Sequence, residues 1–211
     1  MVRHAQPSPK PRAGAEGAEA PPPQPAPVRT FTADEERRLS ENLFGIARDI
    51  RRGAYDQVPV RVDLLRALHG RLFDGVRSHA GRLRGPGFGQ EILVFGPNQS
   101  AHRNDVASRL DDVLERASRS VRSCEDHPDD PRYEEAAFQV AVWLHAEVVG
   151  IHPFEDGNGR TSRALMNVVL HRLGLRPVVV TALKQEYNAA LNHYFTAREI
   201  DVLVDLLLPT D

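Results

Sequence analysis

Cysteine is almost absent from the 211-residue chain, which carries a single thiol at Cys124. An intrachain disulfide is therefore excluded, and the composition fits a reducing compartment. No apolar run approaches the roughly 20 residues that cross a bilayer, and the N-terminus has no apolar signal core. We expect a cytoplasmic protein without a signal peptide or a membrane partner. Export as an effector stays open.

Lysine is nearly missing as well, since Lys10 and Lys184 are the only two and arginine supplies the other positive charges. The formal net charge is −2, so the chain has no excess of positive charge for a polyanion such as DNA. We therefore expect no nucleic-acid partner. The hydrophobic fraction of 41% and the charged fraction of 27% are ordinary for a globular domain of this length.

Proline is concentrated at one end of the chain. Eight of the 16 prolines fall within residues 1–28, among alanine, glycine and glutamine. Such a segment cannot bury enough apolar surface to offset its ordering entropy. We predict a disordered tail at 1–28, with docking through a PxxP motif as the less favoured alternative, and one domain over 29–211.

Most of that domain has the apolar periodicity of helices. Thr32 and Glu35 form a capping box that predicts a first helix over 32–52. Glycines and Pro86 interrupt the pattern over 81–96, where residues 91–95 are β-prone. The fold class predicted is all-α, an orthogonal helical bundle with one small β-hairpin. The remaining helices are predicted over 62–76, 105–121, 133–149, 161–173, 185–194 and 199–208.

The most informative stretch is HPFEDGNGRTSR, residues 152–163. Two glycines just before a helix let backbone N–H groups converge on an anion, and the helix start adds further free N–H donors. Arg160 and Arg163 are three residues apart and can face the same polyanion. Asp156 offers a hard oxygen for Mg²⁺, and His152 can accept a proton near neutral pH. Together these groups are typical of phosphoryl or nucleotidyl transfer.

Calcium-binding and Walker A loops fit this stretch less well. In an EF-hand register, the first and twelfth ligand positions would fall on Phe154 and Leu165, neither of which binds calcium. A Walker A loop requires lysine where Arg160 stands. An ordinary turn between helices would not need so many functional side chains.

The stretch resembles the motif of the Fic family, His-x-Phe-x-Asp/Glu-Gly-Asn-Gly-Arg-x-x-Arg, at every specified position. Upstream, residues 68–73 and 80–84 resemble the segment that leads into the flap of this family. Downstream, residues 187–191 resemble the helix that closes its nucleotide pocket. The resemblance extends over about 39–208 and implies the Fic fold.

The resemblance also implies a reaction and its residues. His152 would be the general base, and Asp156 would hold Mg²⁺ between the α- and β-phosphates. Arg160 would stabilise the leaving β-phosphate, Arg163 would fix the γ-phosphate, and Asn158 would contact the α-phosphate. His152, Asn158 and Arg160 would thus be the catalytic residues. The anion hole would be formed by Gly157, Asn158 and Gly159. The unbroken Gly-Asn-Gly favours transfer of AMP from Mg-bound ATP, the co-substrate, to a hydroxyl of a target protein on Ser, Thr or Tyr.

Two further sets of residues follow from the resemblance. Four flap residues would pair with an extended target segment, or would pack inward as core: Ile92, Leu93, Val94 and Phe95. Tyr187 and Asn188 would line the nucleotide pocket, or would simply belong to the helix core. We expect His145 and Glu147 to pack within their helix rather than to bind a transition metal, because no clear third ligand accompanies them.

Regulation and the exact activity stay open. Many family members have an inhibitory helix with Ser/Thr-x-x-x-Glu-Gly/Asn, whose glutamate pairs with the second arginine of the motif, which is Arg163 in this chain. Glu41-Asn42 matches its second half, but Arg37 occupies the Ser/Thr position, so Glu41 is only a candidate inhibitor. The alternatives are control by a separate partner such as an antitoxin-like inhibitor, self-association, or no such control. The protein could also be a nucleotide-binding regulatory or toxin–antitoxin component, or could transfer another nucleotide or phosphate-containing group.

Overall fold

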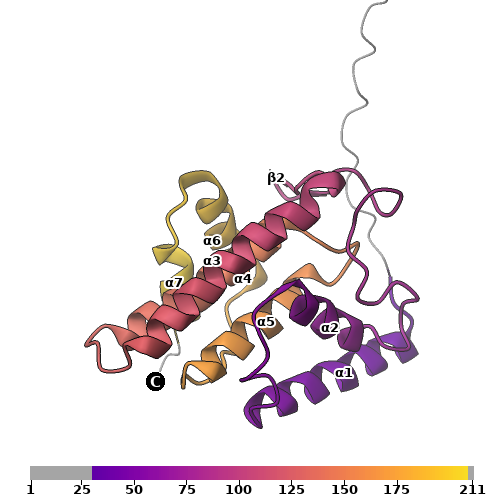
Figure 1. The fold of residues 1–211 in the computed structure, drawn as a ribbon. Helices are drawn as coiled ribbons and strands as arrows, with labels where there is room; N and C mark the ends of the chain where they lie inside the picture. Colours follow the sequence, from indigo (N-terminus) through magenta and orange to yellow (C-terminus); the bar gives the residue numbers. More distant parts are fainter. Residues whose placement is uncertain (1–29, 209–211) are drawn as a thin grey trace, which may run out of the picture.

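A computed structural model of the chain describes residues 30–208, and the predicted tail at 1–28 lies outside them. The described part is mostly helical, as predicted, with one small antiparallel hairpin (Figure 1). In chain order its elements are α1 (Ala33–Arg51), α2 (Val62–Leu72), β1 (Val94–Phe95), β2 (Asn98–Gln99), the 3-10 helix η1 (Arg103–Asp105), α3 (Val106–Asp126), α4 (Tyr133–Ile151), α5 (Asn158–Arg172), α6 (Lys184–Ala197) and α7 (Asp201–Leu207).

Helix α1 begins where the capping box predicted. The Thr32 side chain accepts from the Glu35 N–H, and the Glu35 carboxylate accepts from the Thr32 N–H. Two of the free N–H groups of the helix start are thereby satisfied. Leu39, Ile46 and Ile50 form its buried face, which packs on α2 and α5.

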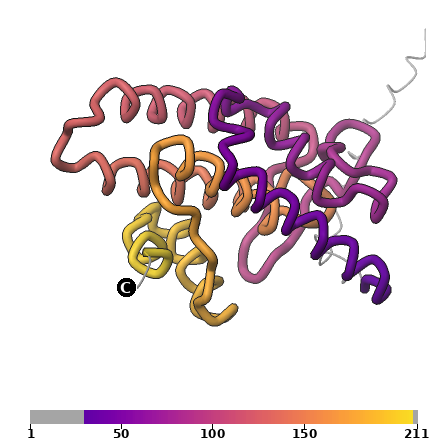
Figure 2. Tube along the Cα trace, turned by 90° about the horizontal axis from the view of Figure 1, so that it is seen from below, coloured from indigo at the N-terminus to yellow at the C-terminus, as the bar shows by residue number. Residues whose placement is uncertain are grey.

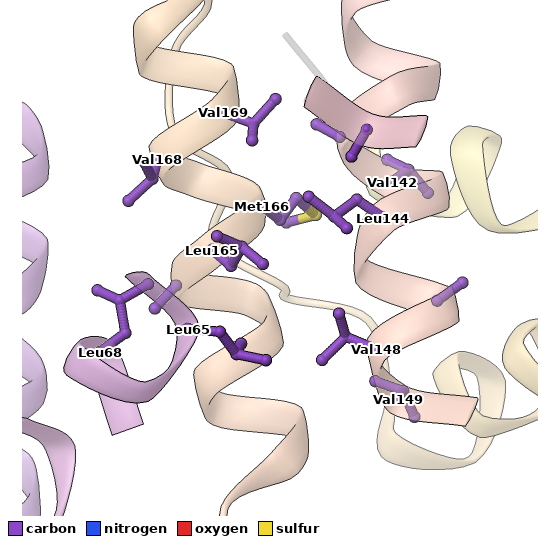
Figure 3. Packing of buried hydrophobic residues seen from close by; sticks show 14 of the residues in the cluster. Leu65, Leu68, Val142, Leu144, Val148, Val149, Leu165, Met166, Val168 and Val169 are labelled. Carbon is purple, nitrogen blue, oxygen red and sulfur yellow. The ribbon is translucent and has the colours of Figure 1, made fainter. Parts of the chain in front are cut away.

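Helix α5 is the centre of the bundle. It lies between α4 on one side and the α1–α2 pair on the other, while α6 and α7 cover another face of α4 (Figure 1). The core joins side chains of α2, α4 and α5 that are almost wholly buried, including Leu65, Leu144 and Leu165 (Figure 3). Because α4 meets helices on several sides, its sequence is apolar around most of its circumference.

The extended segment between α2 and α3 lies at the end of the molecule opposite the α3–α4 turn, so it faces the C-terminal end of α4 (Figure 2). Its hairpin pairs Val94 with Gln99 and Phe95 with Asn98. The Asn98 side-chain amide donates to Asn192 Oδ1 at 2.6 Å, which ties the hairpin to α6.

Four predicted helix ends differ from the structure by three residues or more, one of them in α6, which was predicted to end at 194 and continues to Ala197. Helix α2 ends at Leu72, four residues early, because Gly75 adopts a positive φ of 66°. Helix α3 continues five residues further, to Asp126. Helix α5 begins at Asn158 rather than Thr161, so part of the anion-binding stretch forms the first turn of the helix. Among the helices described, none is long and apolar enough to span a lipid bilayer.

Candidate active site

A cavity of about 760 Å³ opens between α1, α5, α6 and the hairpin. It lies within the size range of small-molecule sites. His152, Arg160 and Arg163 line it together, with Phe95 on one side and Tyr187 on another. The structure therefore brings most of the predicted nucleotide-binding side chains to one cavity.

His152 stands at the junction of α4 and the loop that follows it, in the left-handed region with a φ of 55°. Its Nδ1 lies 3.1 Å from the Val149 carbonyl oxygen. A carbonyl can only accept, so Nδ1 carries the hydrogen and Nε2 keeps its lone pair. The ring also stacks on Phe95, with 4.5 Å between centroids. The base predicted from sequence thus has a fixed orientation and a defined tautomer.

The protonation state of His152 suits a base. Burial lowers its pKa from 6.5 to about 4, although the Val149 carbonyl acts in the opposite direction. The Arg84 charge lowers the pKa further, while Asp156 raises it. The imidazole is therefore neutral at pH 7 and able to take up a proton.

Asp156 has one carboxylate oxygen engaged and one without a partner. Oδ1 accepts from the Gly157 N–H and lies 3.4 Å from an Arg160 guanidinium nitrogen. Oδ2 is buried and has no hydrogen-bond partner among the described residues. Burying a carboxylate oxygen without a partner is costly, so this oxygen fits a bound cation. No cluster of three or more His, Cys, Asp or Glu side chains that could hold a metal ion occurs in the described part of the chain. Mg²⁺ is commonly bound by one or two carboxylates together with phosphate oxygens of the substrate, so Asp156 is the side chain here that could hold it.

The start of α5 offers backbone donors beside this carboxylate. The Thr161 N–H bonds to the Gly157 carbonyl, and within residues 30–208 no acceptor meets the N–H groups of Asn158, Gly159 and Arg160. Free N–H groups at a helix start form an anion site. Arg160 lies close to this end, with its Cζ 5.2 Å from the Phe73 ring centroid and 5.4 Å from that of Phe31.

The side chain of Asn158 differs from the expectation that it touches phosphate. Its Oδ1 accepts from the Phe154 N–H at 2.8 Å, and its Nδ2 donates to the Phe154 carbonyl at 2.9 Å. The side chain is buried, so it closes the loop of residues 152–157 on itself. A phosphate contact by this residue would come from its backbone N–H.

Gly157 meets two constraints at once. Its φ is 74°, and a Cβ on this residue would overlap the Phe73 ring. Glycine alone meets both without strain. The loop can therefore turn sharply into α5 against the end of α2.

His69 holds the loop from behind and was missed as a site residue. The Gly81 N–H donates to Nδ1 at 2.8 Å, so Nε2 carries the hydrogen and donates to the Asp156 carbonyl at 3.1 Å. The ring stacks on Phe154 with 3.8 Å between centroids. Burial lowers the pKa of His69 to about 4, so it stays neutral and keeps this pattern of donors.

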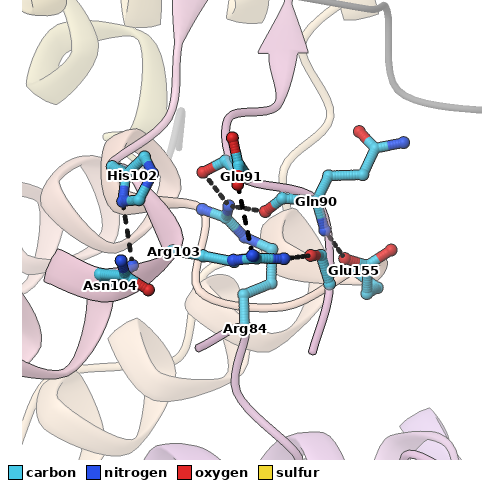
Figure 4. A network of polar contacts seen from close by, with 8 residues as sticks. Arg84, Gln90, Glu91, His102, Arg103, Asn104 and Glu155 are labelled. Carbon is cyan, nitrogen blue, oxygen red and sulfur yellow. Dashed lines mark hydrogen bonds and ion pairs between the residues drawn. The ribbon is translucent and has the colours of Figure 1, made fainter. Parts of the chain in front are cut away.

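Arg84 is the second residue whose role the sequence did not indicate. It is 1% exposed, and its Nε donates to the His152 carbonyl at 2.8 Å. Its other nitrogens donate to oxygens of five residues, among them Gln90 and Glu91, which Figure 4 shows around it. The other three are Ser100, Ala101 and Ile151. The guanidinium thus joins the hairpin segment to the C-terminal carbonyls of α4, where a positive charge is favourable.

The four predicted flap residues differ in their surroundings. Leu93 is 1% exposed, its N–H donates to Ser100 Oγ, and its carbonyl accepts from the Ser100 N–H, so it packs inward. Ile92, Val94 and Phe95 are half-buried. Within the described residues the hairpin is a two-stranded sheet, so each strand keeps one unpaired edge.

Glu41 does not face the cavity. Leu43, Ile46, Ala47 and Ile50 form the wall that α1 contributes, and two positions along a helix correspond to a turn of about 200°. Glu41 therefore points away from that wall, and its carboxylate pairs with Arg37 at 3.3 Å on the exposed surface. The pairing with Arg163 raised by the sequence is not made.

Tyr187 and Asn188 both line the cavity from α6, as predicted. Tyr187 is also buried in the core. The two alternatives left open from the sequence are therefore compatible for Tyr187.

The sequence profile of the Fic/DOC family matches residues 59–170, more than half of the chain, and the chain belongs to this family. It is 33% identical over 127 residues to "Protein adenylyltransferase Fic" of Drosophila yakuba, covering 60% of this chain and 23% of that protein. It is 45% identical over 64 residues to the protein of the same name in Aedes aegypti, covering 30% of this chain and 12% of that protein. The chain thus spans less than a quarter of these relatives.

Solved structures have the same fold. A Fic domain-containing signaling protein from Bacteroides thetaiotaomicron matches with a TM-score of 0.66 and 19% identity, over 84% of this chain and 69% of that one. BepC from Bartonella tribocorum, solved with bound AMPPNP, matches with a TM-score of 0.62 and 17% identity, over 82% and 84%. The predicted Fic fold is confirmed.

Proposed function

We propose that this protein transfers AMP from Mg-bound ATP to a hydroxyl group of a target protein. The observation that carries the proposal is the orientation of His152. Its Nδ1–H is held by the Val149 carbonyl, so the neutral Nε2 is the atom available to a substrate in the cavity. The relatives named protein adenylyltransferase Fic support the same reaction.

In this reaction Nε2 of His152 takes the proton of the target hydroxyl. The hydroxyl oxygen bonds to the α-phosphorus, and the bond from that phosphorus to the oxygen bridging to the β-phosphate breaks. AMP stays on the target and pyrophosphate leaves. A pKa of about 4 keeps His152 neutral before the step, so no prior deprotonation is needed at pH 7.

Negative charge moves toward pyrophosphate during this step. The free N–H groups at the start of α5 and the Arg160 guanidinium would meet that charge without reorganising. Mg²⁺ held by Asp156 would add positive charge beside the phosphates. Arg163 would bind the terminal phosphate from the same helix, one turn further on.

The target segment would add to the hairpin edge next to His152. Strand addition uses main-chain hydrogen bonds and reads little sequence, so it can present a Ser, Thr or Tyr hydroxyl to the base. Phe95 stacks on His152 and so links this edge to the reacting atoms. Since Glu41 faces away from the cavity, any control of activity would come from a separate inhibitor or from self-association rather than from this glutamate.

Incubation with a cell lysate and ATP tests the proposal. Compared with lysate that lacks the protein, its addition should increase the α-phosphate label on protein and leave the γ-phosphate label unchanged. Mass spectrometry should find AMP on a hydroxyl side chain. A nucleotide-binding switch would bind ATP but label nothing. Transfer of γ-label would instead indicate phosphate transfer.

A further inference from the structure

His145 lies near the middle of α4 and is wholly buried, yet the proposed reaction does not use it. Its Nε2 is hydrogen-bonded to the Tyr187 hydroxyl on α6. Its Nδ1 is sealed from solvent, and no group within the described range 30–208 meets it at full hydrogen-bonding geometry. A buried polar ring in a helix so apolar needs an explanation, because leucine would fill the space at lower cost.

The surroundings of His145 define its tautomer. Burial lowers its pKa to about 3, the Arg163 charge lowers it further, and the Ser162 backbone acts in the opposite direction. The Arg163 guanidinium beside Tyr187 has only N–H donors, so the Tyr187 hydroxyl is best placed with its oxygen as an acceptor for Arg163 and its hydrogen directed to Nε2 of His145. Nδ1 therefore carries the hydrogen. Nε2 is then an acceptor, and the Tyr187 hydroxyl is the donor.

This direction of donation matters for Arg163. Once the Tyr187 hydroxyl has donated its hydrogen to His145, its oxygen is left as an acceptor, and a hydrogen bond from the Arg163 side chain to it lowers the pKa of Tyr187. The Arg163 guanidinium lies over the Tyr187 ring, 5.8 Å from Cζ to the centroid, and its positive charge lowers the tyrosine pKa against the rise caused by burial. No carboxylate among residues 30–208 pairs with Arg163. Tyr187 is thus the group that orients this arginine.

We propose that His145, acting through Tyr187, positions Arg163 for the terminal phosphate and thereby sets the preference for nucleoside triphosphate over diphosphate. The inference rests on the proposed function, in which Arg163 meets that phosphate. His145 does not line the cavity, whereas Tyr187 and Arg163 do. It is a positioning residue behind the wall of the site.

Binding of ATP and of ADP, each with Mg²⁺, tests this by calorimetry without any transfer. Tyr187→Phe keeps the ring and removes the hydroxyl, so it should weaken ATP binding by about tenfold while leaving ADP binding nearly unchanged. His145→Leu should do the same. His145→Gln, which restores an acceptor near the position of Nε2, should recover most of the preference. In an Arg163→Ala background, Tyr187→Phe should have no further effect on the ratio of the two dissociation constants.

Tyr194→Phe is the matched control. Tyr194 is a buried tyrosine on the same helix whose hydroxyl donates to Glu147 rather than to a histidine, and it does not line the cavity. Its variant should leave the ratio unchanged. Equal weakening of ATP and ADP by Tyr187→Phe, an unchanged ratio, or an equal effect in the Arg163→Ala background would overturn the inference. Only binding is measured in this test. Absence of AMP transfer in a separate assay would therefore refute the proposed function without changing how the ratio of the two dissociation constants is interpreted.

Discussion

Two neutral, buried histidines should make the protein unusually sensitive to mild acid. His69 and His145 are 1% and 0% exposed, and their pKa values fall from 6.5 to about 4 and about 3. Each pKa is lower in the folded state, so the unfolded chain binds protons that the folded one does not. The stability that these neutral histidines contribute is fully present above pH 6.5 and is lost as the pH falls from 6.5 toward 4.

The magnitude follows from these values. A pH of 5 is about 1.5 units below the histidine pKa in the unfolded chain. Protonation of the unfolded chain therefore lowers the free energy of unfolding by about 2 kcal/mol for each histidine. The two histidines together therefore lower the free energy of unfolding by about 4 kcal/mol at pH 5. This is a large part of the 5–15 kcal/mol by which a whole domain is typically stable. The half-buried His152, with a pKa of about 4, adds in the same direction.

Urea unfolding between pH 7.5 and pH 5 measures this effect. The free energy of unfolding should fall by at least about 4 kcal/mol, with uptake of at least about two protons on unfolding at pH 5. A variant with glutamine at both 69 and 145 should be less stable at pH 7.5 but should lose about 4 kcal/mol less on acidification. If the wild-type protein and this variant had the same pH dependence, the argument for buried neutral histidines would be refuted.

Three further predictions concern the supports of the site. Gly157→Ala should lower the free energy of unfolding by at least about 2 kcal/mol more than Gly174→Ala does. Both glycines have a positive φ, but of the two only Gly174 has open space for a Cβ. Similar losses in the two variants would argue against the close packing of the loop. Arg84→Lys should lower the unfolding free energy by about 3 kcal/mol, because one ammonium cannot replace a guanidinium among so many buried oxygens; a fully stable variant would contradict this. Glu41→Gly should leave ATP affinity unchanged, whereas Ala47→Glu should lower it by placing a carboxylate in the cavity wall. Isothermal calorimetry compares the two variants. Tighter ATP binding by Glu41→Gly, with no loss in Ala47→Glu, would restore Glu41 as the inhibitor.

Local features of the fold were predictable because their causes lie within a few residues. The capping box at Thr32 determines the start of α1, and glycines with Pro86 exclude a helix between α2 and α3. The stretch from His152 to Arg163 likewise contains its glycines, carboxylate and cations in one short segment. The helix start at Asn158 was placed three residues late, because the loop before it closes through a side chain.

The supporting residues could not be predicted because their partners are distant in sequence. His69 meets Asp156 across 87 positions, and Arg84 meets His152 across 68. A histidine or arginine by itself gives no sign of which carbonyl it will reach. Asn158 shows the same limit at short range, because its position in the motif does not reveal whether its amide faces phosphate or the loop backbone.

The central claim, that His152 is the base of a nucleotidyl transfer, is tested most directly by separating binding from transfer in His152→Ala. Calorimetry should show ATP affinity within about twofold of wild type, because in the proposed reaction Nε2 would contact the target hydroxyl rather than the phosphates. Transfer of α-label to protein should fall by about 100-fold or more. His127→Ala, at an exposed histidine just after α3, should retain full activity. Undiminished labelling by His152→Ala, with its fold intact, would contradict the account.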